Sequence, residues 1–161
     1  MRNKKAQFIT QAAVLAALYV VLTLIANGLG LANYAIQVRF SEALTILPYF
    51  TPAAIPGLTA GCLISNLLTG CMPLDVVFGS LATLLGAIGT YALRKWKWTA
   101  PLPPILANTL IVPFVLAYVY QFEGSIPYFM VTVGIGEILS CGVLGMIFMG
   151  ILNKYRNVIF K

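Results

Sequence analysis

Long runs of apolar residues, separated by short polar or proline-containing stretches, dominate the pattern along this chain. Four clear runs extend from Gln7 to Leu31, Leu74 to Leu93, Leu102 to Phe122 and Ile126 to Leu152. Each run approaches or exceeds the roughly 20 residues that a helix needs to cross the hydrocarbon core of a bilayer. The pattern therefore predicts an all-α integral membrane protein, with a transmembrane helix in each of these runs.

The segment between Phe40 and Cys71 is also apolar, but prolines interrupt it. These prolines are Pro48, Pro52 and Pro56. Proline inside a helix removes a backbone hydrogen bond and clashes with the preceding turn, so one uninterrupted helix is disfavoured here. We predict a break around residues 50–52, with a short helix from Ser41 to Tyr49 and one of ordinary length from Ala53 to Leu68.

The basic residues occur mainly at the two ends of the chain and at one place in the middle. They are Arg2, Lys4, Lys5, Arg94, Lys95, Lys97, Lys154, Arg156 and Lys161. Clusters of this kind mark cytoplasmic loops under the positive-inside rule. If the amino terminus and the Arg94–Lys97 loop are both cytoplasmic, an even number of crossings separates them, and only the split version of the segment after Phe40 supplies four. We therefore predict six transmembrane helices, the second one short, with both termini cytoplasmic.

Composition supports one membrane domain over residues 1–161. Hydrophobic residues make up 60% of the chain and charged residues 9%, whereas about a quarter of the residues in a soluble domain are charged. The net charge of +6 does not indicate a nucleic-acid partner. The basic residues flank apolar runs, and they lack the clustered patch with interleaved aromatic residues that nucleic-acid binding uses.

Motifs for catalysis or for a metal are missing from the sequence. The cysteines Cys62, Cys71 and Cys141 are far apart, there is no histidine, and we interpret the cysteines as small buried apolar residues. The chain has neither a phosphate-binding glycine-rich loop nor a nucleophile elbow. We therefore expect neither an enzyme nor a cofactor or metal. Uphill transport would have to draw on an ion gradient or on another subunit.

The strongest local signal lies at the beginning of the short second helix. Ser41 is expected to cap this helix, and Glu42 falls in its first turn, next to Arg39. At 1.5 Å per residue, the helix covers only about half of the hydrocarbon thickness, so its amino end must lie within the protein or line a cavity. Either Arg39 and Glu42 neutralise each other there, or they contact a substrate at the outer mouth.

Two further acids lie in apolar stretches. Asp75 follows Pro73 at the start of its run, where stabilisation of a helix amino terminus explains it as well as ligand binding does. Glu137 lies eleven residues into the last run with no basic residue near it in sequence, which favours a ligand or an internal pair. Asn66 and Asn108 supply uncharged polar groups, either for a ligand or for interhelical hydrogen bonds.

Small residues recur along the first helix in two parallel rows. One row contains Ala6, Thr10, Ala13 and Ala17, and the other contains Ala12 and Ala16. Such rows allow helices to approach closely, either within the protein or against another one. The spacing by itself does not favour an external partner.

Three ordered motifs are QVRFSEAL at Gln37–Leu44, GLTAGCLISN at Gly57–Asn66 and DVVFGSLATL at Asp75–Leu84. Together they resemble the QueT family, which comprises substrate-binding S components of energy-coupling factor (ECF) transporters. The resemblance extends over the whole chain. It implies the six-helix S-component fold, a bacterial cell membrane, and uptake of a queuosine precursor, which is a 7-deazaguanine such as preQ0, preQ1 or queuine.

The resemblance also implies partners and a moving part. S components dock their first helix onto a transmembrane T subunit through alanines, and two cytoplasmic ATPase subunits complete the complex. Applied to this chain, docking would use Ala13 and Ala17 first, and Ala12 and Ala16 second. The loop from Gly28 to Gln37 would cover the substrate site. The candidate gating residues in this loop are Gly28, Gly30 and Tyr34.

The polar residues suit such a substrate. A guanine-like edge presents an N–H group and an exocyclic amine side by side, and one carboxylate accepts both. Three acids against one arginine in the membrane leave room for an aminomethyl cation on the ligand. The predicted substrate-binding residues are Gln37, Arg39, Glu42, Asn66, Asp75, Asn108 and Glu137.

Alternative functions fit the same chain. An S component for thiamine or riboflavin would share the fold, because related folds serve many ligands. A carrier that works alone would use Glu137 or Asp75 as its ion site. In a purely structural membrane subunit, the charges would only hold helices together.

Overall fold

The computed structural model describes residues 3–31 and 38–159, with the backbone alone for the last three of these. All regular structure in the described residues is helical. The elements are α1 (Lys4–Gly28), η1 (Phe40–Tyr49), α2 (Ala54–Leu68), α3 (Pro73–Ala92), η2 (Lys97–Thr99), α4 (Leu102–Tyr118), α5 (Ile126–Glu137), η3 (Ile138–Leu144) and α6 (Gly145–Ile159). η1 and η2 are 3₁₀ helices, and η3 is a π-helical stretch that joins α5 to α6 without a break.

The predicted helices correspond to α1, η1, α2, α3, α4 and the continuous α5–η3–α6 rod. Within the described residues, four helical stretches are long and apolar enough to cross a membrane, and α2 is a shorter apolar helix. The predicted end of the fifth helix at Phe122 is wrong, because α4 ends at Tyr118 and the chain turns through Gln121, whose φ is 51°. Regular helix cannot continue through a residue in this left-handed conformation.

The proline-induced break is confirmed, since η1 ends at Tyr49 and α2 begins at Ala54. Two details of the short helix differ from prediction. It is a 3₁₀ helix, whose rise of about 2.0 Å per residue gives it a length of about 20 Å. Ser41 does not cap it: η1 begins one residue earlier, and the Ser41 hydroxyl instead accepts a hydrogen bond from Thr23 of α1 at 2.8 Å.

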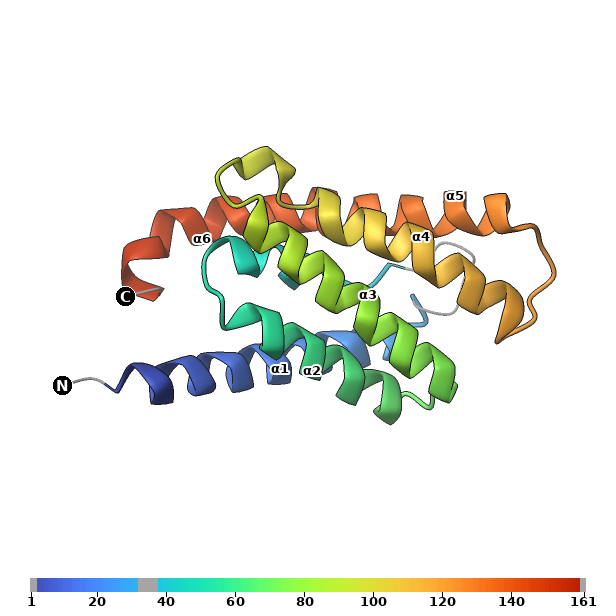
Figure 1. Cartoon of the computed structure of the whole chain (residues 1–161), viewed down its shortest axis with the longest axis horizontal. Coiled ribbons are helices and arrows are strands. Elements are labelled where there is room, and N and C mark those ends of the chain that lie inside the picture. The colour runs from blue at the N-terminus through green and yellow to red at the C-terminus, as the bar shows by residue number, and fades with distance from the viewer. Residues whose placement is uncertain (1–2, 32–37, 160–161) are drawn as a thin grey trace.

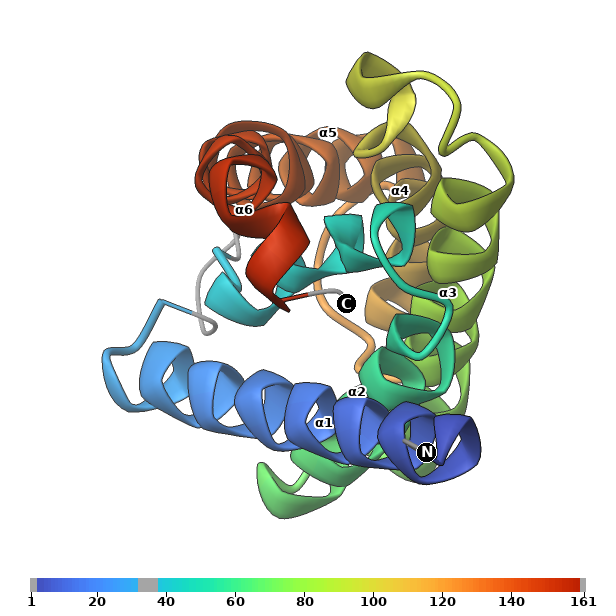
Figure 2. The ribbon, with the colours of Figure 1, turned by 90° about the vertical axis from the view of Figure 1, so that its left-hand side faces the viewer.

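η1 occupies the middle of the molecule. It contacts α1, α2 and α3 on one side and η3 and α6 on the other, so the longer helices surround it (Figure 2). Its residues Leu44, Ile46 and Leu47 are buried in the main apolar core. The other buried members of this core are Tyr19, Ala54, Leu58, Cys62, Ala100, Met149 and Leu152. A short helix is therefore accommodated at membrane depth because protein covers it, as the sequence argument required.

α1 and α2 approach closely through small residues. A Cβ atom added to Gly57 would lie 2.7 Å from the carbonyl oxygen of Ala12. A Cβ atom added to Gly61 would lie 2.9 Å from that of Ala16. The row Ala12 and Ala16 is thus used for packing within the chain, whereas Ala13 and Ala17 are exposed.

The two ends of the molecule differ in charge. The first turn of α1, the last turns of α6 and the loop with η2 lie at the same end, on the left in Figure 1. The basic residues of these three segments therefore share one end, as the even number of crossings between them requires. The opposite end is formed by the connections between α2 and α3 and between α4 and α5, and it contains the functional site described next.

Candidate functional site

A cavity of about 610 Å³ lies at the end of the molecule opposite the basic clusters. The carboxyl-terminal parts of α1, α2 and α4 and the amino-terminal parts of α3 and α5 form its walls, and Arg39 reaches it from the residue before η1. Most of the wall is apolar, with a limited number of polar groups. Cavities with this volume and composition are typical of small-molecule sites.

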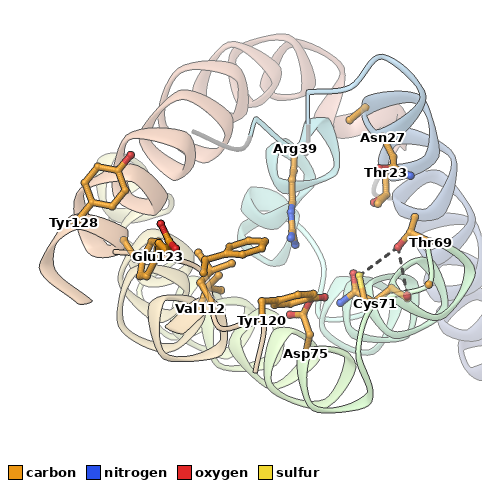
Figure 3. A pocket seen from close by; sticks show the side chains of 16 residues that line it. Thr23, Asn27, Arg39, Thr69, Cys71, Asp75, Val112, Tyr120, Glu123 and Tyr128 are labelled. Carbon is orange, nitrogen blue, oxygen red and sulfur yellow. Dashed lines mark hydrogen bonds between the residues drawn. The ribbon is translucent and has the colours of Figure 1, made fainter. Parts of the chain in front are cut away.

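The Arg39 side chain extends into the middle of the cavity (Figure 3). The backbone holds it in place, because the N–H group of Arg39 donates to the Ser140 hydroxyl of η3 at 3.2 Å. The sequence placed the amino end of the short helix inside the protein or at a cavity. The structure brings Arg39 to the cavity itself.

Asp75 and Tyr120 form one hydrogen-bonded wall. Asp75 lies in the first turn of α3 and is 7% exposed, and one of its carboxylate oxygens accepts a hydrogen bond from the Tyr120 hydroxyl at 2.7 Å. The same hydroxyl accepts from the backbone N–H of Met72 at 3.3 Å. Burial and the bond to the Asp75 carboxylate both raise the pKa of Tyr120, so its hydroxyl stays protonated and keeps donating.

Other groups complete the cavity. Asn66 comes from the carboxyl-terminal half of α2, is 4% exposed, and borders the cavity near Thr69. Glu123 and Tyr128 lie at the opposite rim, on the connection between α4 and α5 and in the first turn of α5 (Figure 3). The cavity therefore presents one guanidinium and two carboxylates from different elements.

The remaining residues predicted for the substrate site and its loop divide into three groups. Glu42, Asn108 and Glu137 are buried, but they do not border the cavity and form a separate cluster next to η3. Tyr34 and Gln37 lie outside the described residues. Gly28 ends α1, and Gly30 adopts a φ of +74°, which favours glycine, so the chain leaves α1 in a sharp turn.

Sequence reasoning missed Tyr120 and Glu123 as site residues. Both follow the actual end of α4, so the predicted helix to Phe122 placed Tyr120 inside a regular element and Glu123 in an ordinary outer loop. One signal was present: Tyr120, Phe122 and Glu123 combine aromatic rings with an acid at the end of an apolar run. In the structure the Tyr120 and Phe122 rings stack at 5.5 Å and both border the cavity.

A helical membrane protein with a solute-sized, mostly apolar cavity that contains a few polar groups at one end has the architecture of a membrane transport protein. The family model of the QueT transporter matches residues 9–154, and the chain belongs to this family. A protein of Lactococcus lactis subsp. cremoris (strain MG1363) named queuosine precursor transporter QueT is 31% identical over 166 residues, which covers 96% of each of the two chains. No solved structure matches the chain. The resemblance seen in the three sequence motifs is thus confirmed.

Proposed function

We propose that this chain is the substrate-binding S component of an energy-coupling factor importer and that it takes up a queuosine precursor. The observation that carries this proposal is family membership over residues 9–154, together with a relative of the same length that is named a queuosine precursor transporter. The cavity adds a place for such a solute. Its volume of about 610 Å³ falls within the range of small-molecule sites and leaves room for a substituent on the base.

The polar groups of the cavity suit a 7-deazaguanine. The buried Asp75 carboxylate, oriented by Tyr120, is matched to the adjacent N–H and amine groups of a guanine-like edge. Asn66 offers an amide for the carbonyl of the base. The stacked aromatic rings Tyr120 and Phe122 provide a flat apolar wall for the ring system. Glu123, on the exposed rim, is placed to receive an aminomethyl cation.

In this proposal, the residues Glu42, Asn108 and Glu137 contribute to the site without bordering the cavity. They lie in the layer beneath the cavity, and Arg39 stands between that layer and the solute. Gln37 keeps its predicted role in substrate binding, and Tyr34 keeps its predicted role in the covering loop between α1 and η1. The backbone N–H of Val38 donates to the Leu31 carbonyl at 3.2 Å, so the two ends of that loop are held together.

Substrate binding is tested by thermal unfolding of the purified protein in detergent. A ligand that binds only the native state stabilises it by about 2.7 kcal/mol when its concentration is a hundred times Kd. We expect preQ0, preQ1 or queuine to raise Tm, while guanine, thiamine and riboflavin raise it less or not at all. Asp75→Asn should abolish the shift, because an amide presents a donor where the base edge needs an acceptor. Glu123→Gln should weaken only a ligand with an aminomethyl cation.

The contrary outcomes point to named alternatives. A shift with thiamine or riboflavin alone would support the vitamin S component. No shift with any deazaguanine, from a protein that is folded, would overturn the proposed substrate. Uptake by the isolated chain, abolished by an uncoupler and independent of ATP, would support the carrier that works alone.

The remaining parts of the proposal concern topology and partners. Both termini and the loop with η2 lie on the cytoplasmic side, because these segments contain the basic clusters. The membrane is that of a bacterial cell, as the family resemblance implies. The cavity then opens outward. The exposed row Ala13 and Ala17 on α1 docks onto a T subunit, and two ATPase subunits supply the energy. Substrate is released inward when the whole subunit topples in the membrane against the T subunit.

A further inference from the structure

The cluster beneath the cavity contains three potential metal ligands from distant parts of the chain. One carboxylate oxygen each from Glu42 and Glu137 and the sulfur of Cys141 lie within 4.8 Å of one another. Glu42 and Glu137 are 2% and 8% exposed, and Cys141 is completely buried. Buried acids at membrane depth require compensation, and this cluster does not border the solute cavity.

Two of these ligands lie at the helix irregularity η3. Glu137 is the last residue of α5, the π-helical stretch begins at Ile138, and Cys141 lies within it. The Cys141 sulfur is 3.1 Å from Glu137 Oε2, so both side chains point to the same interior position. π-Helical turns are rare and occur frequently at functional sites.

Cys141 has more hydrogen-bond acceptors around it than its single thiol hydrogen can serve. The sulfur lies 3.1 Å from Glu137 Oε2, 3.4 Å from the Glu42 carbonyl oxygen and 3.3 Å from the Thr45 hydroxyl. Thr45 gives its own hydrogen to the Glu42 carbonyl at 2.6 Å, so it offers Cys141 an acceptor. A thiol has one hydrogen and can serve only one of these three acceptors.

Glu42 adds an unsatisfied oxygen to the same place. Its Oε1 accepts a hydrogen bond from the Tyr19 hydroxyl at 2.5 Å. Its Oε2 is buried and has no hydrogen-bond partner among the described residues. A buried carboxylate oxygen without a partner is costly, and the Asn108 amide nitrogen of the same cluster is likewise buried without a partner, so the cluster leaves one acceptor and one donor unsatisfied among the described residues.

We propose that Glu42, Glu137 and Cys141 bind a divalent cation of the zinc class, directly below the solute cavity. Zinc accepts mixed sulfur and oxygen ligands, with Zn–S near 2.3 Å and Zn–O near 2.0–2.2 Å, whereas calcium and magnesium require oxygen ligands alone. Such bond lengths put the ligand atoms of a tetrahedral site about 3.5 Å apart, so a small inward shift of the side chains closes this one. Binding would provide the missing partner of Glu42 and remove the proton of Cys141.

The surroundings match this assignment. Tyr19 hydrogen-bonds to the Glu42 carboxylate and so orients it, as outer partners of metal ligands do, whereas Thr45 bonds to the Glu42 backbone carbonyl. Charges also balance: two carboxylates and a thiolate are offset by a divalent ion together with the nearby Arg39. The sequence did not suggest a metal because the spacing is unusual, with Cys141 lying 99 residues after Glu42.

The test uses Co²⁺ as a coloured substitute for zinc on the full chain, purified in detergent and stripped with a chelator. We expect one Co²⁺ per chain, a thiolate-to-cobalt charge-transfer band, and loss of that band when excess Zn²⁺ is added. Cys141→Ser should remove the band, and Glu137→Gln should weaken binding at least tenfold. Cys71→Ser is the matched control and should keep the band, because Cys71 lies near Thr69 and outside the cluster.

Several results would overturn the site. These are no bound cobalt, a band that persists in Cys141→Ser, or equal binding by Glu137→Gln. Should Cys141→Ser fail to fold, the affinity of Glu137→Gln and the control decide the question. The measurement needs no solute, so failure of the cation site and failure of the proposed substrate are distinguished by measuring the deazaguanine-induced Tm shift on the same preparation.

Discussion

The two rows of small residues on α1 both consist mainly of alanine, but their surroundings are opposite. Ala12 and Ala16 face α2, where Gly57 and Gly61 approach so closely that an added Cβ atom would collide with the α1 backbone. Ala13 and Ala17 are shifted by one residue, or about 100° around the helix, and they are exposed. Close packing inside the chain thus occupies one row and leaves the other available.

This difference shows what decides the use of a small-residue row. The inner row continues along the same face through Tyr19, which bonds to Glu42, and Thr23, which bonds to Ser41 and borders the cavity. The outer row does not face Gly57 and Gly61 of α2, which pack against the inner row. α1 therefore connects the exposed row, which we propose as a docking surface, with the interior of the end that contains the cavity.

The largest effect is expected from filling the inner contact. In Gly61→Leu the new Cβ atom would lie 2.7 Å from the Tyr19 Cβ atom and 2.9 Å from the Ala16 carbonyl oxygen, and backbone atoms cannot give way as a flexible side chain does. We expect destabilisation of about 3 kcal/mol or failure to fold, measured by thermal unfolding in detergent. Gly150→Leu is the control, since nothing lies within 4 Å of its added Cβ atom. Equal stability of the two variants would contradict the packing described here.

A smaller effect is expected from the polar end of the inner row. Tyr19→Phe keeps the ring but removes the donor to Glu42 Oε1, which leaves both oxygens of this buried carboxylate without a protein partner among the described residues. The expected loss of stability is about 1–3 kcal/mol. Tyr155→Phe, at a half-exposed position, should change stability little. A Tyr19→Phe protein as stable as the parent would show that the Tyr19 hydroxyl is not needed to satisfy Glu42.

The outer row should give the smallest effect on stability and a clear effect on transport. Ala13→Leu and Ala17→Leu add bulk at exposed positions, so Tm and the deazaguanine-induced Tm shift should remain those of the parent. Uptake in cells, and co-purification with the T subunit, should be lost if this row docks the partner. Val14→Leu, at an adjacent exposed position, should leave uptake intact. Normal uptake by both alanine variants would contradict docking through this row.

Much of the fold was predictable because the apolar runs and the prolines are local signals. The break before α2 was found from Pro48, Pro52 and Pro56, since the effect of proline on a helix does not depend on the rest of the protein. The 3₁₀ character of η1 and the use of Ser41 were not predictable. Both depend on neighbours brought from elsewhere, such as the Thr23 hydroxyl, which lies 18 residues earlier in the chain.

The site was predictable in part, for a similar reason. Arg39, Asn66 and Asp75 were identified as polar groups in apolar runs, and the structure brings all three to one cavity. The sequence did not separate them from Glu42 and Glu137, because depth along the membrane depends on the lengths and tilts of packed helices. Tyr120 was missed because its importance arises from a hydrogen bond across 45 residues to Asp75.

The continuous inner face of α1 has a thermodynamic consequence. Helical geometry places Thr23 about 15 Å along the axis from Ala13, and the helix between them is regular, so a displacement at one end is transmitted to the other. Suppose that a partner and the solute each bind more tightly to one of two positions of α1. The partner then changes the affinity of the cavity for the solute by a certain factor, and the solute changes the affinity of the protein for the partner by the same factor. If α1 docks a partner and the cavity binds the solute as proposed, the two binding events are thus linked reciprocally through this one helix.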